Sequence, residues 1–188
     1  LKALFDASEL GAFCAEVARI QASGERNAQG DIPRVDRRQA VPLSYSQQRM
    51  WFLWQMEPNS PAYNVGGMAR LRGTLHVDAF ERALHALVVR HETLRTTFPS
   101  IEGVPYQCVA DDSNLQLAWQ DFSALPDAAR QQRLQQLADQ QAHQAFDLES
   151  GPLLRACLVK LQEREHVFVL TLHPVSYTHL TLPTKRIV

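Results

Sequence analysis

Apolar and polar positions along the chain predict helices that alternate with strands. Residues 1–20 carry apolar side chains at helical spacing: Leu10, Phe13, Cys14 and Val17. Ser8 or Asp6 is placed to cap that helix. Residues 21–40 then combine glycine, proline and mixed charges with few large apolar side chains, which predicts a solvated linker and a domain boundary.

The ordered pattern resumes at Val41. Ser44 and Gln47 form an S-x-x-Q capping box, and the helix that it starts should end before Pro58. Its apolar positions include Met50, Trp51, Phe52, Leu53 and Trp54. We expect the two tryptophans and Phe52 to lie in the core, since large apolar side chains that follow a cap at helical spacing are usually buried.

The next stretch predicts a strand, a second helix and several short strands. Residues 63–71 alternate apolar and polar side chains, as in a half-buried strand, and Gly73 follows them. Asp78 and Glu81 predict a capping box for a helix that runs to about Arg90. Short strands are expected around residues 95–98, 104–109 and 115–119.

The last third predicts a long helix and a strand pair. Pro126 suits the first position of a glutamine-rich helix. Residues 153–161 and 166–172 predict two strands, and the second is apolar at nearly every position, as in a strand covered on both faces. The expected fold is a mixed α/β layer structure with substantial antiparallel pairing.

Composition narrows the functional classes. The chain has 188 residues, 45% of them hydrophobic, and a formal net charge of -1, which suits a globular protein and gives no basic footprint for nucleic acid. No apolar run approaches the roughly 20 residues that span a bilayer. Cys14, Cys108 and Cys157 have no short spacing, so we expect small buried side chains in a cytoplasmic protein. Because the sequence starts at Leu1, we also expect an excised or incomplete chain.

Histidines provide the candidate chemistry. His173 follows a buried-type strand, where it could act as a general base at the mouth of a cleft or simply end the strand. His91 and Glu92 are adjacent, so on a helix they would point in different directions, which favours a hydrogen-bonded helix end. The spacing of the histidines, cysteines and carboxylates predicts no metal site.

Three stretches resemble motifs of one family, the condensation domains of nonribosomal peptide synthetases. Residues 44–53, which include Ser44, Gln47 and Arg49, resemble its first core motif. Residues 90–98 match R-H-E-x-L-R-T-x-F and contain Arg90, His91 and Arg95. Residues 146–155 resemble the segment before the catalytic motif.

The resemblance implies a domain layout. It assigns residues 41–173 to the N-terminal lobe of a condensation domain, the first half only of a chloramphenicol acetyltransferase-like α/β fold. Residues 1–20 resemble the last helix of a carrier domain, residues 21–40 are then the linker, and residues 174–188 resemble a non-native tail.

The family's activity is amide-bond formation between two carrier-bound aminoacyl or peptidyl thioesters. The resemblance therefore implies partners: upstream and downstream carrier domains, an adjacent adenylation domain and the second lobe, with no nucleic acid and no membrane. It implies no cofactor bound directly, because the phosphopantetheine arms belong to the carrier domains.

The sequence departs from the family's catalytic motif, H-H-x-x-x-D-G. His173 fits its first histidine, but Pro174 stands at the second, catalytic histidine and Thr178 at the aspartate. Arg95 is the candidate partner of that aspartate in the family pattern. We therefore expect this chain to be inactive. Two alternatives stay open: a non-catalytic module that docks carrier domains, and a stand-alone acyltransferase of the same fold that uses coenzyme A thioesters.

Overall fold

The computed structural model describes residues 9–22, 40–112 and 115–176. The chain divides into two compact units, residues 1–37 and 38–188. In the first, helix α2 (Leu10–Ala22) carries an ion pair between Arg19 and Glu16 at 2.8 Å. The candidate caps Ser8 and Asp6, nearly all of the predicted linker and most of the predicted tail lie outside the described residues. Within the described ranges, no helix is both long and apolar enough to cross a membrane.

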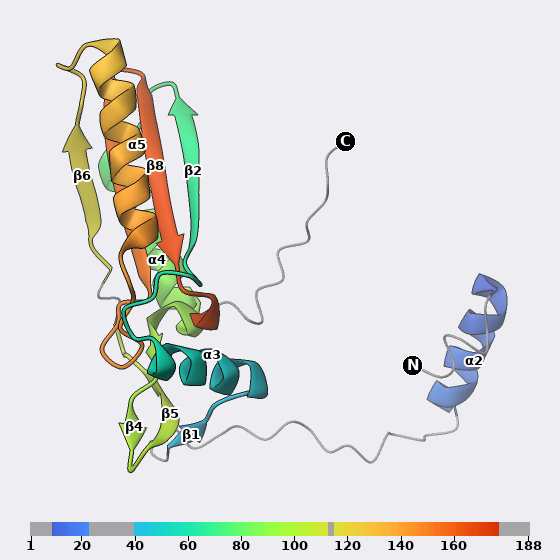
Figure 1. The fold of residues 1–188 in the computed structure, drawn as a ribbon. Coiled ribbons are helices and arrows are strands. Elements are labelled where there is room, and N and C mark those ends of the chain that lie inside the picture. The colour runs from blue at the N-terminus through green and yellow to red at the C-terminus, as the bar shows by residue number, and fades with distance from the viewer. Residues whose placement is uncertain (1–8, 23–39, 113–114, 177–188) are drawn as a thin grey trace. The chain divides into compact units, whose positions relative to one another are not determined.

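The second unit contains a four-stranded sheet in the order β2-β8-β7-β6 (Figure 1). β8 (Glu165–Leu172) pairs antiparallel with both β2 (Val65–Arg72) and β7 (Leu154–Gln162). β6 (Leu117–Asp121) runs parallel to β7. The tight turn between β7 and β8 sets the central register, and the predicted strand pair is confirmed.

Helices cover both faces of the central strands. On one face α5 (Asp127–His143) buries Leu137 against Val159 and Val169. On the other face α4 (Val77–Arg90) places Phe80 edge-on against Phe168, with ring centroids 5.0 Å apart. Because β8 has a helix on each face, it carries apolar side chains in both alternating sets, as its sequence predicted.

A second, smaller sheet lies under helix α3. Its central strand β5 (Val104–Val109) pairs antiparallel with β1 (Val41–Pro42), β3 (Thr96–Thr97) and β4 (Ser100–Ile101). α3 (Tyr45–Met56) packs Met50, Trp51 and Trp54 on one buried cluster: Leu43, Phe98, Phe146, Leu148, Leu153 and Val175. The capping box is present, with Gln47 N–H donating to Ser44 Oγ at 3.3 Å and Ser44 N–H to Gln47 Oε1 at 2.9 Å.

Two predicted helix starts were wrong by one or two residues. α4 begins at Val77 with His76 as N-cap and without a side-chain cap bond, so Asp78 lies inside the first turn. At that position its carboxylate still interacts favourably with the positive, N-terminal end of the helix dipole. Pro126 is the N-cap of α5 and not its first helical residue.

Several burial predictions were also wrong. Phe52 is 61% exposed because it lies on the face of α3 opposite the core, and most of β2 is exposed rather than half-buried. Cys14 and Cys108 are exposed, and Cys157 is buried as expected. The strand expected at residues 95–98 shrinks to β3, because residues 92–95 form the 3-10 helix η1 (Glu92–Arg95).

Candidate functional site

His173 directly follows β8 and lies in the interior of the second unit. The residue is 5% exposed. Its backbone N–H donates to the backbone carbonyl of Leu153, the residue before β7, at 3.0 Å. The short 3-10 helix η2 (Pro174–Ser176) follows, and Val175 N–H donates to His173 Nδ1 at 3.3 Å. An imidazole that accepts at Nδ1 carries its proton on Nε2, so this bond selects one neutral tautomer.

Apolar neighbours surround the imidazole. Phe146 meets the His173 ring edge-on at 6.1 Å and 77°, and both Phe146 and Val175 belong to the cluster under α3. Burial in this environment lowers the pKa of His173 to about 4. His173 is therefore neutral at pH 7 and enclosed, rather than exposed at the mouth of a cleft.

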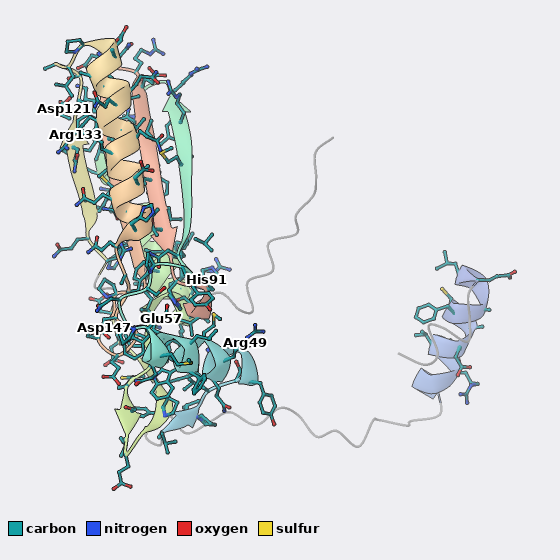
Figure 2. All side chains as sticks on the ribbon, in the orientation of Figure 1. Arg49, Glu57, His91, Asp121, Arg133 and Asp147 are labelled. Atoms are coloured by element: carbon teal, nitrogen blue, oxygen red, sulfur yellow. The ribbon has the colours of Figure 1, made fainter. Side chains whose placement is uncertain are left out.

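The helix that contains residues 44–53, the stretch that resembles the first core motif, contacts the cluster that encloses His173. Trp51 Nε1–H donates to Phe98 O at 3.1 Å, and Trp54 Nε1–H donates to Phe146 O at 3.0 Å. Both tryptophans are partly buried, and an indole N–H withdrawn from water usually finds such an acceptor. Arg49 is exposed on α3 (Figure 2), away from these contacts.

The second motif forms the end of α4 and the turn after it. Arg90 is exposed at the last helical position, and His91 N–H donates to Leu87 O at 3.0 Å, as predicted for a hydrogen-bonded helix end. The Arg95 guanidinium donates to Ala110 O and, at 3.4 Å, to the Glu92 carboxylate. Thr178, at the position of the motif aspartate, lies outside the described residues.

The sequence did not reveal the contact that supports Phe146. The Arg155 guanidinium carbon lies 3.6 Å from the centroid of the Phe146 ring, on its face. The available signal was an arginine between the apolar Leu154 and Ala156 of a buried strand, because a charge there needs partners.

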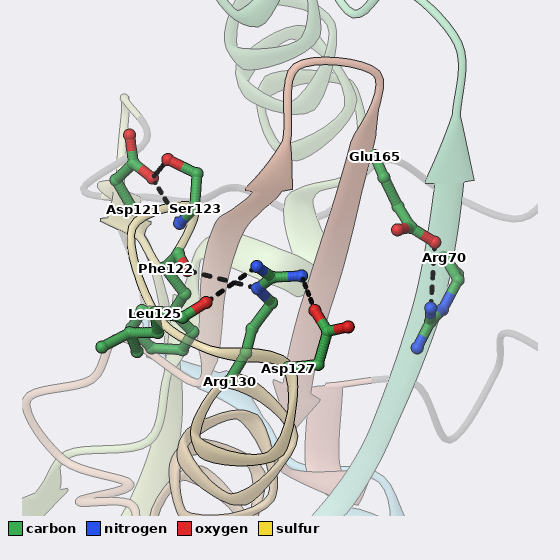
Figure 3. A network of polar contacts seen from close by, with 8 residues as sticks. All are labelled: Arg70, Asp121, Phe122, Ser123, Leu125, Asp127, Arg130 and Glu165. Carbon is green, nitrogen blue, oxygen red and sulfur yellow. Dashed lines mark hydrogen bonds and ion pairs between the residues drawn. The ribbon is translucent and has the colours of Figure 1, made fainter.

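A separate polar network joins the start of α5 to β6 (Figure 3). Arg130 donates to Phe122 O at 3.3 Å, Leu125 O at 2.8 Å and the Asp127 carboxylate at 2.9 Å. These bonds satisfy the guanidinium locally, so the network fastens a helix rather than presenting charge to a ligand. In the described part of the chain, no three histidine, cysteine or acidic residues lie close enough to hold a metal ion.

Comparison with known proteins identifies the family. The condensation domain family matches residues 37–175. The chain belongs to that family. The condensation domain resemblance seen in residues 44–53 and 90–98 is thereby confirmed.

The related sequences are peptide synthetases. The chain is 42% identical over 176 residues to a linear gramicidin synthase of Brevibacillus parabrevis, a match that covers 93% of this chain and 2% of the relative. It is 41% identical over 157 residues to the phosphinothricin tripeptide synthetase PhsC of Streptomyces viridochromogenes, covering 83% of this chain and 14% of the relative. The chain thus spans a small part of each of these relatives.

Solved structures support the condensation domain fold. The starter condensation domain of the rhizomide synthetase RzmA superposes with a TM-score of 0.67 at 24% identity, covering 73% of this chain and 33% of that one. The X-domain in the complex with OxyB from teicoplanin biosynthesis gives a TM-score of 0.64 at 32% identity, covering 74% and 29%. Both matches place the second unit within the predicted α/β fold class.

Proposed function

We propose that residues 41–173 are the N-terminal lobe of a condensation domain whose parent synthetase joins two carrier-bound thioesters through an amide bond. The observation that carries the proposal is the family match over residues 37–175. The match extends just past β8 and includes His173, the residue that follows this strand. The relatives are named as peptide synthetases, which supports peptide-bond formation as the reaction of the parent protein. The resemblance to the family implies aminoacyl and peptidyl thioesters as the substrates. Carrier domains, an adenylation domain and a second lobe are the partners, in the cytoplasm.

Amide-bond formation requires help at the attacking amine. The acceptor amine attacks the donor thioester carbonyl, the C–N bond forms, the C–S bond breaks, and the donor thiol leaves while the amine loses a proton. A base or an orienting acceptor beside the amine assists this step. The phosphopantetheine arms arrive as parts of the substrates.

The described chain does not provide that base at the motif. Pro174 stands where the family has its catalytic histidine, and proline has no side-chain acceptor. His173 has Nδ1 occupied by Val175 N–H and a pKa lowered by burial, so it is a weak proton acceptor at neutral pH. Its part is to anchor the start of the motif, and we propose that this chain is inactive.

A chimera tests the lobe assignment. Residues 41–173 replace the equivalent lobe of the condensation domain in the phosphinothricin tripeptide synthetase PhsC. The relative's own sequence then continues from the second histidine of the motif through its second lobe. Donor-loaded and acceptor-loaded carriers are added, and the condensed product is measured by mass spectrometry. We expect product above a no-protein control. The matched chimera that retains Pro174 should give none.

Two results would contradict the proposal. A folded chimera with an intact motif but no product would reject the lobe assignment. Turnover by the unmodified 188-residue chain would reject its inactivity.

A further inference from the structure

The last turn of α5 receives hydrogen bonds from a strand residue. Arg155 Nη2–H donates to Gln141 O at 3.0 Å and to Gln144 O at 2.6 Å, and Nη1–H donates to Ala145 O at 3.2 Å. The last carbonyls of a helix have no partner within the helix. From its position on β7, Arg155 therefore donates hydrogen bonds to backbone carbonyls at the C-terminus of α5 and in the loop after this helix.

Two more elements hold the same loop. Asn64, just before β2, donates through Nδ2 to Ala142 O at 2.7 Å and to Gln144 O at 2.8 Å. Trp54 of α3 donates to Phe146 O at 3.0 Å. Five backbone carbonyls between residues 141 and 146 thus accept bonds from side chains on β7, just before β2 and on α3.

The guanidinium of Arg155 also faces the next aromatic ring. It lies 3.6 Å from the centroid of the Phe146 ring, a distance at which a cation and an aromatic face attract each other. Phe146 is 4% exposed, and its ring meets the His173 ring edge-on. Arg155, Phe146 and His173 therefore form a chain of contacts from β7 to the end of β8, face-on at the first contact and edge-on at the second.

We propose that Arg155 is a positioning residue that holds His173 in place through Phe146. The guanidinium fixes the loop by its carbonyl bonds and the Phe146 ring by stacking, and the ring in turn supports the imidazole. The bond from Val175 N–H to His173 Nδ1 depends on that support. The importance of this for catalysis rests on the proposed function, since His173 begins the motif, but the positioning itself does not.

Arginine suits this place better than lysine. A planar fork can donate to several carbonyls while its face stays on a ring, whereas an ammonium is a compact point charge. Burial lowers the pKa of Arg155 from its ordinary value, which is consistent with a partly buried guanidinium. The carbonyl bonds satisfy both Nη groups, whereas the buried Nε has no hydrogen-bond partner among the described residues.

Nuclear magnetic resonance of the 188-residue chain tests the proposal without any turnover. The readouts are the ¹⁵N shifts of the His173 ring and hydrogen exchange at the Val175 amide, with the Phe122 amide as reference. Phe122 N–H donates to Lys160 O at 2.9 Å, and Phe122 belongs to the separate buried cluster that Leu137 of α5 joins, so it reports general loosening. The variants are Arg155→Met and Arg155→Lys, with Arg133→Met on the exposed face of α5 as the matched control (Figure 2).

In Arg155→Met we expect the His173 Nδ1 shift to move and Val175 exchange to accelerate about tenfold relative to Phe122, the scale of a lost buried cation–π contact. Arg155→Lys should restore part of both readouts, and Arg133→Met should match the parent chain. An Arg155→Met variant that behaves like Arg133→Met would overturn the proposal.

If Arg155→Met does not fold, Phe146→Leu decides. It keeps the guanidinium and its carbonyl bonds but removes the ring, so His173 and Val175 should respond while Phe122, in a separate buried cluster, does not. An unchanged His173 signal in Phe146→Leu would refute the proposal that Arg155 holds His173 in place through Phe146. Because these signals do not need a product, an inactive chimera and an unsupported His173 remain separate results.

Discussion

The burial of His173 makes the stability of the fold depend on pH. Its pKa falls from 6.5 to about 4 on folding, so between those values the unfolded chain binds a proton that the folded chain does not. The free energy of unfolding should therefore decrease as the pH is lowered from 7 to 4, by about 2–3 kcal/mol from this residue.

Urea denaturation at pH 7 and pH 4.5 measures this decrease. His173→Asn keeps an acceptor near Val175 N–H but does not titrate, so it should remove this share of the pH dependence. His76→Gln, at an exposed position, should leave it intact. Equal pH dependence in His173→Asn and the parent chain would refute the burial argument.

Gly151 gives a second prediction for a single residue. Its φ is +66°, and a Cβ there would lie 2.9 Å from Thr97 Cγ2. Gly151→Ala should therefore destabilise the fold by about 2 kcal/mol through backbone strain and crowding together. Thermal or urea unfolding measures the loss.

Gly67 on β2 provides the control for Gly151, since a Cβ there meets nothing within 4 Å. Gly67→Ala should change the stability by less than about 0.5 kcal/mol. Equal effects at the two glycines would mean that neither the φ nor Thr97 constrains Gly151.

At the scale of single elements, α3 tests whether a local helix cap contributes to stability. Ser44→Ala removes the cap acceptor for Gln47 N–H and should lower the unfolding free energy by about 1 kcal/mol. Ser44→Thr keeps a hydroxyl and should retain most of the stability. Chemical denaturation of the two variants measures the difference, and a loss as large for Thr as for Ala would argue against capping.

The elements also explain why sequence analysis succeeded at some positions and failed at others. The Ser44 capping box could be predicted because both partners lie within one helical turn. The same pattern at Asp78 misled, because the helix begins at Val77 and a short motif does not determine where a helix starts. Phe52 and Trp51 are adjacent apolar residues, and only the position of the core decides which of them is buried.

The site was predicted unevenly for a related reason. His173 could be located because it ends an apolar strand and begins a resembling motif. Its enclosure depends on Phe146 and the buried cluster under α3, whose contacts join residues far apart in sequence. Such pairings follow from the sheet register and the path of the loop after α5, which no local pattern contains.

On the scale of the whole molecule, the second unit exposes an apolar surface over β2 and β8. Val65 and Met68 are 46% and 52% exposed, and they line a shallow groove with Phe168, Leu170 and Leu172. Exposed apolar surface of this kind favours association when nothing covers it. Because β2 is an edge strand of the described sheet, its unpaired backbone groups add to the tendency.

We therefore expect the 188-residue chain to associate as its concentration rises, which sedimentation velocity measures directly. Met68→Lys puts a charge on the exposed edge strand and should shift the chain toward monomer. Ile101→Lys is the matched control, since Ile101 is 59% exposed but lies on β4 in the smaller sheet. A parent chain that stays monomeric at all concentrations, or an equal effect of the two lysines, would show that the β2 surface does not drive association.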